Sequence, residues 1–528
     1  MLRISNIKLP IDHSEKDIIN KVCKVLKIKD QAVSEFSIFK KSLDSRKKNN
    51  IHYIYSIDVS VKDESKYVKV PNVKLVEKQE YVVPQLSCDK RPIIVGAGPA
   101  GLYVALILAE AGLKPLVLER GSDVDTRKLE IDKFWATGEL NPNSNVQFGA
   151  GGAGTFSDGK LTTGTKDPRR VKFLKELIAA GAPEEIEYMA KPHVGTDILI
   201  NVVRNLDQKI TRLGGEIIYN AHVYDFQTDQ AIKAVSYTHE GQEYTVETDH
   251  LVMAIGHSAR DTFELMHQKE IAMKAKPFSV GVRIEHLQSE LNYNQFGELC
   301  TSLPAAEYKV NMRTREDNRG VYTFCMCPGG VVVAASSEPG MVVTNGMSYY
   351  ARDLENANSA LLVSINPEDF GGDVNPLAGI EFQRSLERSA FEHGGSNYHA
   401  PAQLVKDFQA GIASSTFGKV TPSYAPGVKL TNLHDVLPEF ICEALSESLN
   451  VLAGKLEIFG DGDAVMTAVE SRSSSPVTII RDDQYNSSIK GLYPCGEGAG
   501  YAGGIVSAAI DGIRTAEKVL SNIIDNAE

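Results

Sequence analysis

The chain has 528 residues, 42% of them hydrophobic and 23% charged, which is ordinary for a globular protein and too long for a single core. A net charge of −12 argues against general affinity for nucleic acid, and no apolar run reaches the roughly 18 residues of a membrane-spanning helix. Seven scattered cysteines without a CxxC pair argue against disulfide and zinc frameworks, so we expect a cytoplasmic protein without a metal.

The first 85 residues differ in character from the rest of the chain. Residues 1–90 contain 18 Lys and Arg against 12 Asp and Glu, a net charge of +6, which leaves −18 for the remainder. A basic turn at 44–50 could dock an acidic protein partner or RNA, although a solvated hairpin loop is the plainer interpretation. The pattern predicts a small α+β domain, followed by an extended connector at 70–91. The segments of this domain are expected to be extended at 2–9, helical at 14–26, and extended at 32–42 and 51–61.

A glycine motif follows the apolar run at 92–94 and reads Val-Gly-Ala-Gly-Pro-Ala-Gly over residues 95–101. Gly96 permits a tight turn from strand to helix, Gly98 lets the backbone approach a pyrophosphate, and Gly101 lets the helix pack closely on the strand. A helix at 102–111 and a second apolar stretch at 114–118 complete the unit, which ends at Glu119 and Arg120. A carboxylate there can accept hydrogen bonds from both ribose hydroxyls. The unit predicts a site for the ADP half of a dinucleotide.

A second glycine-rich segment occupies residues 148–160, with five glycines at 149–159. Such a segment is costly to order, so we expect something to hold it. Backbone lying against a cofactor at Gly152, Gly154 and Thr155 would do so. A flexible surface linker is the alternative, and Phe148 and Phe156 count against it.

The remaining chain divides into an insert and a second glycine turn. Residues 250–257 have the form of a buried parallel strand that stops at Gly256. Strand-like runs lie at 278–284, 321–327 and 331–335, and Pro328-Gly329-Gly330 predicts a hairpin between the last two. Residues 489–504 and a helical stretch at 505–520 repeat the order of strand, glycine turn and helix. We therefore predict domains at 1–85, 86–275, 276–460 and 461–528.

These motifs together resemble the FAD-binding pattern of the glutathione-reductase-like flavoproteins. The segments at 151–161, 254–261 and 496–504 are more closely similar to an uncharacterised family of bacterial FAD-dependent dehydrogenases, and the resemblance covers the whole chain. It implies a Rossmann-like α/β FAD-binding domain formed from N-terminal and C-terminal parts. It also implies an inserted α+β substrate domain and the small N-terminal α+β domain.

The resemblance assigns cofactor roles to individual residues. It implies that Gly96, Gly98 and Gly101 lie at the pyrophosphate, Glu119 at the adenosine ribose and Glu497 near the ribityl chain. Many relatives have Gly-Asp where this chain has Gly-Glu, so the Glu497 carboxylate lies one methylene farther out. The helix after Gly504 would point its positive end at the flavin and favour the anionic reduced form. The full predicted set is Gly96, Gly98, Pro99, Ala100, Gly101, Glu119, Arg120, Gly152, Gly154, Thr155, Gly256, Gly496, Glu497, Gly503, Gly504 and Ile505.

Four residues are candidates for catalysis. Cys325 and Cys327 lie two apart on a predicted strand, where alternate side chains share a face, so they could form a redox pair. Inert buried packing is the alternative, because a disulfide across CxC is strained. His257 and Arg260, just past the strand at 250–257, could donate a proton or hydrogen bond near the cofactor. Loop anchoring is the alternative for both.

Three further residues are candidates for binding the substrate. His193 lies in a polar cluster before a helix that Thr196 or Asp197 is expected to cap. Arg283 and Arg384 could clamp a carboxylate or phosphate. Structural ion pairs with Glu285 or Glu381 are the alternative for these two arginines.

The sequence favours an FAD-dependent oxidoreductase that transfers hydride between flavin and a small-molecule substrate. No second GxGxxG follows a strand, so NAD(P)H as a reductant would visit the cleft transiently, or a protein carrier would reduce the flavin. One alternative is a flavin-dependent tRNA-modifying enzyme, supported only by the basic N-terminal segment. Another is a non-catalytic FAD-binding sensor whose N-terminal domain docks a protein partner.

Overall fold

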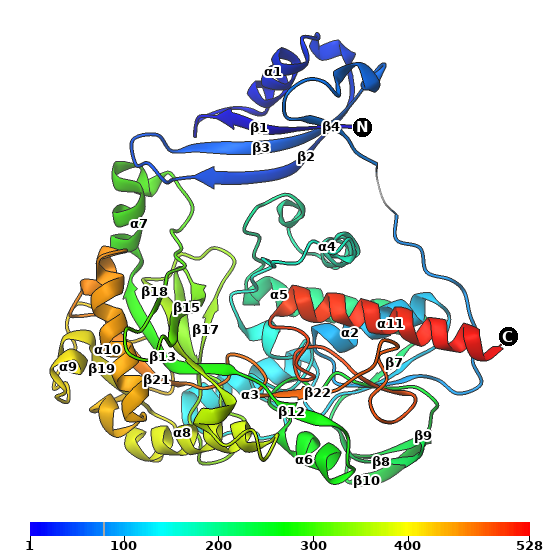
Figure 1. Ribbon diagram of the computed structural model, residues 1–528, viewed down its shortest axis with the longest axis vertical. Coiled ribbons are helices and arrows are strands. Elements are labelled where there is room, and N and C mark those ends of the chain that lie inside the picture. The colour runs from blue at the N-terminus through cyan, green and yellow to red at the C-terminus, as the bar shows by residue number, and fades with distance from the viewer. Residues whose placement is uncertain (78–79, 528) are drawn as a thin grey trace.

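The computed structural model describes residues 1–77 and 80–527, with a parallel sheet, a larger mixed sheet beside it and the N-terminal unit at one end (Figure 1). The parallel sheet has the strand order β23-β11-β5-β6-β7. The strands come from distant parts of the chain but run parallel, so the glycine turns that follow them meet at one edge of the sheet. The strands are β5 (Ile93–Val95), β6 (Leu116–Leu118), β7 (Glu216–Ile218), β11 (Leu251–Met253) and β23 (Leu492–Pro494).

The parallel sheet is covered on both faces. Ile94 and Val117 pack into a layer of helices, whereas Ile93 and Leu116 pack on the opposite side. Burial of both faces explains why the strands read as continuous apolar runs. The predicted strand at 250–257 is confirmed as β11, and helices follow both glycine turns. The helical layer comprises α2 (Pro99–Glu110), α4 (Arg169–Ala179), α5 (Thr196–Arg212) and α11 (Ile505–Ala527). The layer on the opposite face comprises β8 (Ala221–Asp229), β9 (Ala231–His239), β10 (Gln242–Glu247) and α6 (Arg260–Gln268).

The larger sheet has the order β14-β15-β18-β13-β21-β19-β20 and is antiparallel except between β19 and β20. It includes β21, which lies beyond residue 460, so the sheet extends past the predicted end of the insert. Its strands are β13 (Phe278–Leu287), β14 (Asn311–Arg313), β15 (Gly320–Cys327), β18 (Asn356–Ile365), β19 (Ala400–Leu404), β20 (Val428–Leu430) and β21 (Val465–Glu470). Its helices are α7 (Gln288–Phe296), α8 (Ala378–Gly394), α9 (Val405–Ala410) and α10 (Glu439–Ala453).

Two small elements connect these layers. A two-stranded sheet pairs β12 (Met273–Ala275) with β22 (Val477–Ile479), at the two places where the chain passes between the layers. Helix α3 (Val124–Thr137) packs through Phe134 into the core of the larger sheet. Within residues 1–77 and 80–527, no helix combines the length and apolarity needed to cross a membrane.

The N-terminal unit follows the predicted order of extended and helical segments. It contains β1 (Leu2–Leu9), α1 (Glu15–Leu26), β2 (Val33–Asp44), β3 (His52–Val61) and β4 (Val73–Leu75). Residues 73–75 of the predicted connector form β4 and pair with β1, so they belong to the N-terminal sheet; residues 78 and 79 lie outside the described part. Strand β2 binds the main body through its backbone: the Lys41 N–H donates to the Tyr188 carbonyl (2.7 Å) and the Ala190 N–H to the Lys41 carbonyl (2.8 Å).

The predicted hairpin at 321–335 is wrong. Strand β15 pairs with β14 and β18, whereas β16 (Gly330–Ala334) pairs with β17 (Thr344–Ser348) in a separate sheet. Cys325 has a left-handed φ of 43°, and the register between β15 and β18 shifts between Phe324 and Cys327. This bulge breaks the ladder before the Pro328-Gly329 turn, so the chain leaves the sheet instead of folding back on it.

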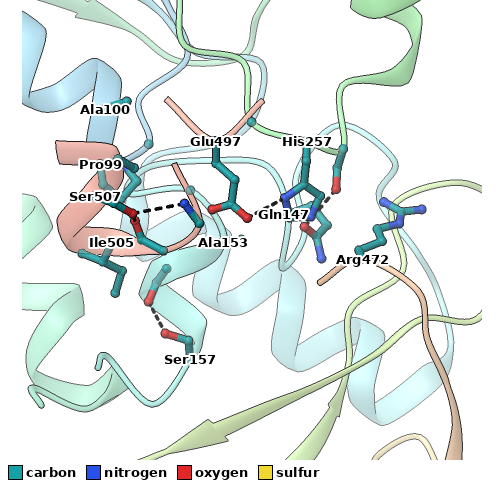
Figure 2. A pocket seen from close by; sticks show the side chains of 18 of the residues that line it. Pro99, Ala100, Gln147, Ala153, Ser157, His257, Arg472, Glu497, Ile505 and Ser507 are labelled. Atoms are coloured by element: carbon teal, nitrogen blue, oxygen red, sulfur yellow. Dashed lines mark hydrogen bonds and ion pairs between the residues drawn. The ribbon is translucent and has the colours of Figure 1, made fainter. Parts of the chain in front are cut away.

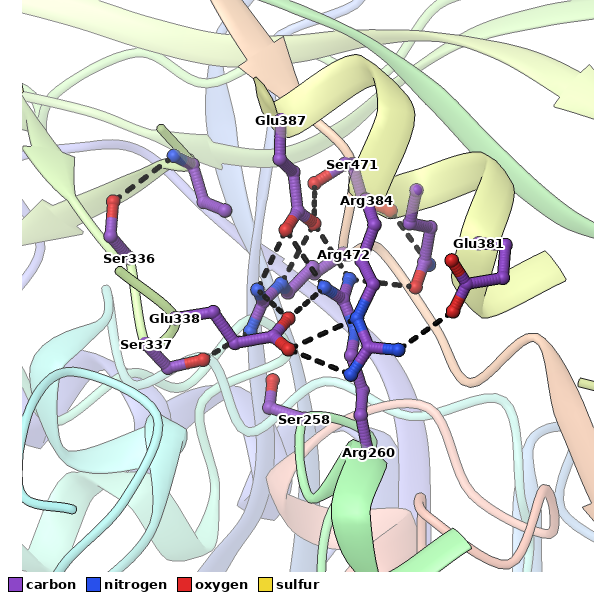
Figure 3. Close-up of polar contacts among 12 residues, drawn as sticks. Ser258, Arg260, Ser336, Ser337, Glu338, Glu381, Arg384, Glu387, Ser471 and Arg472 are labelled. Atoms are coloured by element: carbon purple, nitrogen blue, oxygen red, sulfur yellow. Dashed lines mark hydrogen bonds and ion pairs between the residues drawn. The ribbon is translucent and has the colours of Figure 1, made fainter. Parts of the chain in front are cut away.

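A buried cluster of arginines and glutamates joins the larger sheet to the loop after β11 (Figure 3). Glu387 of α8 is fully buried and accepts hydrogen bonds from Arg260, the first residue of α6 (2.7 and 2.9 Å), and from Arg472, just after β21 (2.8 and 2.9 Å). Glu338 pairs with Arg260 and with Arg384 (2.8 Å). Burial alone would raise the pKa of Glu387, but the two guanidinium groups hold it well below its ordinary value. The charged carboxylate thus links the two sheets.

We predict that Glu387→Gln lowers the free energy of unfolding by about 3–5 kcal/mol, because it leaves two buried guanidinium groups without their shared counter-charge. Urea unfolding at neutral pH measures this loss. The matched control is Glu381→Gln on the same helix, whose side chain is 65% exposed. Its ion pair with Arg384 should contribute about 1 kcal/mol or less. Equal losses in the two variants would contradict the role given to Glu387.

Candidate functional site

A cavity of about 800 Å³ lies where the glycine turns of the parallel sheet face the larger sheet (Figure 2). Segments predicted from distant parts of the sequence meet in its wall. Fifteen of the predicted site residues line it: Gly96, Gly98, Pro99, Ala100, Glu119, Arg120, Gly152, Gly154, Gly256, His257, Cys325, Glu497, Gly503, Gly504 and Ile505. The cavity is therefore the candidate site.

The reason for the absence of a side chain differs among the three glycines of the first turn. Gly96 has a φ of +100°, and a Cβ added there would lie 2.4 Å from the Ala254 carbonyl oxygen. A Cβ on Gly101 would lie 1.9 Å from the carbonyl oxygen of Gly96. Gly98, in contrast, has an ordinary φ of −76°, and an added Cβ would come no closer than 3.9 Å to Gly152 Cα. The fold itself tolerates a side chain at Gly98, so its absence leaves room for a ligand.

Two helix N-termini converge on this cavity. Helix α2 begins at Pro99, and no side chain among the described residues caps its first turn. Helix α11 begins at Ile505, and Gly503, Gly504 and Ser507 line the cavity in front of it. Uncapped N–H groups and the positive ends of two helix dipoles form a site suited to phosphate groups.

Glu119 ties three segments together at the end of β6. Its Oε2 accepts the Ala97 N–H (2.7 Å), and its Oε1 accepts the N–H groups of Gly121 and Gly149 (both 2.9 Å). A carboxylate has about four acceptor positions, so one remains on Oε2 for a ribose hydroxyl. One free acceptor is fewer than the two predicted, because N–H groups of the first turn, of the chain after β6 and of the glycine-rich segment take the other three.

His257 and Glu497 form an ion pair across the cavity wall (Figure 2). His257 Nδ1 lies 3.3 Å from Glu497 Oε1. His257 Nε2 is buried and has no hydrogen-bond partner within the described ranges 1–77 and 80–527. One ring nitrogen is thus fixed by a carboxylate, and the other is left for whatever occupies the cavity.

The opposite wall carries two cations that share one carboxylate. Asp158 is fully buried and accepts hydrogen bonds from Lys160 Nζ (2.7 Å) and Arg352 Nε (3.0 Å). Burial alone would raise the pKa of Asp158, but Lys160 and Arg352 lower it. Lys160 and Arg352 both line the cavity, so this wall has an excess of positive charge.

Three family descriptions match successive parts of the chain. Residues 1–60 match a domain of unknown function, residues 90–285 match the pyridine nucleotide-disulphide oxidoreductases, and residues 277–473 match the C-terminal domain of FAD-dependent proteins. An uncharacterised protein of Clostridium beijerinckii is 47% identical over 530 residues, which cover 98% of both chains. The chain belongs to an uncharacterised family of FAD-dependent oxidoreductases.

Solved structures of flavoproteins are similar at much lower identity. The flavin-dependent brominase Bmp2 is 14% identical, with 83% of this chain and 80% of that chain covered and a TM-score of 0.37. A variant of the E. coli quinol fumarate reductase is 12% identical, with 84% and 71% covered and a TM-score of 0.37. Similarity at this level does not establish a shared activity.

FAD is the cofactor of this family, and the cavity has the features it requires. Gly98 leaves space beside an uncapped helix N-terminus for the pyrophosphate, and Glu119 retains one acceptor for the ribose. His257 Nε2 offers an orphan polar atom to the cofactor or to a molecule beside it. Gly101, Thr155 and Gly496, which were also predicted to contact FAD, lie behind the wall: Thr155 bonds the Ala150 carbonyl, and a Cβ on Gly496 would meet Ala100 Cβ at 2.7 Å.

The three predicted arginine sites are internal ion pairs. Arg260 is buried against Glu387, and Arg384 binds Glu338, Glu264 and Glu381. Arg283 is fully buried and pairs with Glu470 (2.9 Å) rather than with Glu285. None of the three lines the cavity, and the alternative given for Arg384, an ion pair with Glu381, is present (2.7 Å). A buried guanidinium needs a counter-charge, and each of these finds one inside the protein.

His193 and the expected helix cap also differ from prediction. His193 lies behind Lys160, where Nε2 is 2.9 Å from the Tyr350 carbonyl and burial lowers its pKa. Helix α5 begins after Gly195 without a side-chain cap from the described residues. The Thr196 hydroxyl donates to the Thr155 carbonyl, and Asp197 accepts the Tyr350 N–H, so both side chains bind outside their own helix.

The two cysteines do not share one face of a regular strand. Cys325 lines the cavity, whereas Cys327 is buried behind it, because the bulge in β15 interrupts the alternation of side chains. Sequence reasoning missed several other wall residues. Lys160 ends the glycine-rich segment and was detectable by position, but Tyr308, Asn345, Arg352 and Arg472 carry no local signal.

We predict that Gly98→Glu abolishes FAD retention, while Gly98→Ala weakens FAD binding at least about 10-fold, equivalent to about 1.4 kcal/mol. The reason is that the added atoms occupy ligand space and meet no protein atom closer than 3.9 Å from the Cβ. Flavin absorbance relative to protein absorbance measures retention, and circular dichroism checks folding. Gly101→Ala is the contrast, because its Cβ would clash with Gly96 and should impair folding itself. A flavin-loaded Gly98→Glu protein would overturn the pyrophosphate assignment.

Proposed function

We propose that the protein transfers hydride between its flavin and a small-molecule substrate held against the larger sheet. The observation that carries the proposal is that one cavity has two chemically different walls. The wall from the parallel sheet fits FAD, and the facing wall brings polar side chains to the same space from the glycine-rich segment (Lys160), from β17 (Asn345) and from the end of β21 (Arg472). Bound FAD supplies two-electron redox chemistry, and the residues around it bind, orient and protonate.

His257 is the proposed proton donor or hydrogen-bond donor of the reaction. Its Nδ1 faces the Glu497 carboxylate, which fixes the orientation of the ring. The free Nε2 then lies in the wall of the cavity, where a substrate reduced at a carbonyl or double bond requires a proton. The Glu497–His257 pair thus orients one donor atom toward the reacting molecule.

The reductant is proposed to be NAD(P)H bound transiently in the same cavity, because in the described part of the chain only the GxGxxG at 96–101 directly follows a strand. The alternative is a sensor that binds FAD without turnover. Anaerobic mixing with NADH and NADPH separates these proposals: loss of flavin absorbance with either donor supports the enzyme. Protein that neither donor reduces, and that no small molecule reoxidises after dithionite reduction, would favour the sensor.

We predict that His257→Asn slows reoxidation of the reduced protein by its substrate about 100-fold. The substrate is first found by anaerobic screening of enones, 2-oxo acids and quinones against dithionite-reduced protein. FAD content and the dithionite reduction should be unchanged, because His257 acts on the second half-reaction. His267→Asn is the control, since His267 is exposed on α6 outside the cavity. A His257→Asn protein that is reoxidised at the normal rate would remove His257 from the mechanism.

A further inference from the structure

Cys325 and Cys327 are in hydrogen-bond contact at the substrate end of the cavity. Cys325 is half-buried and lines the cavity, and the buried Cys327 thiol donates a hydrogen bond to the Cys325 carbonyl (3.2 Å). In a regular strand alternate Cα atoms lie about 6.6 Å apart, near the upper limit of about 6.8 Å for a disulfide. The left-handed φ of 43° at Cys325 bends the backbone out of this extended form. The irregular strand therefore turns the Cys327 thiol back toward the Cys325 backbone.

Positive charge surrounds this pair of thiols from three elements. Arg283 of β13 donates to the Cys325 carbonyl (2.8 Å) and lies 3.9 Å from Cys327 Sγ. Lys160, from the glycine-rich segment, donates to the carbonyl of the intervening Met326. The carboxylates that face them are Glu470 of β21, paired with Arg283, and Asp158, shared by Lys160 and Arg352. Glu307, which also lines the cavity, is a third carboxylate close to Lys160 and Arg352.

The Cys325 thiolate is a further anion beside these cations. The hydrogen bond from Cys327 lowers the pKa of Cys325 to about 6, with help from Arg283 and Lys160 and against burial and Asp158. Burial raises the pKa of Cys327, and the neighbouring Cys325 raises it further. At neutral pH Cys325 is therefore a half-buried thiolate that lines the cavity, and Cys327 is a buried thiol beside it.

We propose that Cys325 is a reactive thiolate in the cavity and that Cys327 is its resolving thiol, so that the pair is a reversible oxidation site for hydrogen peroxide. Peroxide is a small neutral oxidant that can reach a half-buried sulfur at the end of a cavity. The proposal rests on the contacts of the two thiols and does not depend on hydride transfer.

The chemistry balances with peroxide as the oxidant. The Cys325 thiolate attacks one peroxide oxygen, the O–O bond breaks, and the leaving hydroxide takes a proton to become water, which leaves a sulfenic acid. The sulfur of Cys327 then attacks the sulfur of Cys325, the S–S bond forms, the S–O bond breaks, and the hydroxide leaves as water with the proton of Cys327. Two thiols and one peroxide give one disulfide and two waters. The disulfide removes the negative charge that faces Lys160 and Arg283.

Alkylation of the FAD-loaded protein tests the thiolate. Iodoacetamide pulses over a range of pH, read by peptide mass spectrometry, should label Cys325 at least about 10-fold faster than Cys88 at neutral pH. Cys88 is a matched control because it is also half-buried, but burial and Asp89 raise its pKa. Cys327→Ala should shift the labelling midpoint of Cys325 upward, whereas Cys327→Ser keeps a donor and should shift it less. Labelling of Cys325 no faster than that of Cys88 would overturn the proposal.

Peroxide treatment tests the resolving role. The wild-type protein should yield a Cys325–Cys327 disulfide that dithiothreitol reverses, while Cys327→Ala should stop at a sulfenic acid that dimedone traps. Wild-type protein that passes instead to sulfinic acid at Cys325 would show that Cys327 does not resolve it. Unreactive Cys325 in both proteins would overturn the site as a whole.

Discussion

The carboxylate of Glu387 is the interaction on which the cavity depends. It binds Arg260, where the loop after β11 enters α6, and Arg472, where β21 leaves the larger sheet. Arg260 lies three residues after His257, and Arg472 itself lines the cavity. One buried anion therefore fixes the distance between the wall that fits FAD and the wall that faces the substrate. A purely apolar contact would bury a similar area but would not set this geometry, because apolar packing has no directional bonds.

Glu119 has a comparable role at the other end of the cavity. Its three backbone hydrogen bonds hold the first glycine turn, the end of β6 and the glycine-rich segment around one carboxylate. Glycine-rich backbone is costly to order, and these bonds offset part of that cost. The same group that positions the segment retains one acceptor for the ribose. The candidate site for FAD is thus held together by a residue that also lines it.

The parts of the site that could be predicted from the sequence are those whose residues lie close together in one short segment. The turn at 95–101, Glu119 and the helix start after Gly504 were each visible because a turn, its neighbours and their spacing occupy a few adjacent residues. The pairs Arg283–Glu470 and Arg352–Asp158 join residues 187 and 194 positions apart, and no local pattern marks them. The hairpin prediction failed for a related reason: Pro328-Gly329-Gly330 has the composition of a turn, but the bulge at Cys325 depends on Arg283 and Lys160 from elsewhere in the chain. Tertiary contacts decided these positions.

Whether a polar side chain is paired inside the protein also distinguishes residues proposed to act in the chemistry from residues that stabilise the fold. A buried charge or donor is costly unless it is paired, so the arginines chosen as candidates from the sequence pair with glutamates inside the protein. Arg260, Arg283 and Arg384 each bind carboxylates, and their charge is largely used up by the fold. His257 keeps a nitrogen without a partner in the described structure, and Cys325 keeps a sulfur on the cavity surface. Both residues also line the cavity, and this combination is the physical reason to propose chemistry at these two positions.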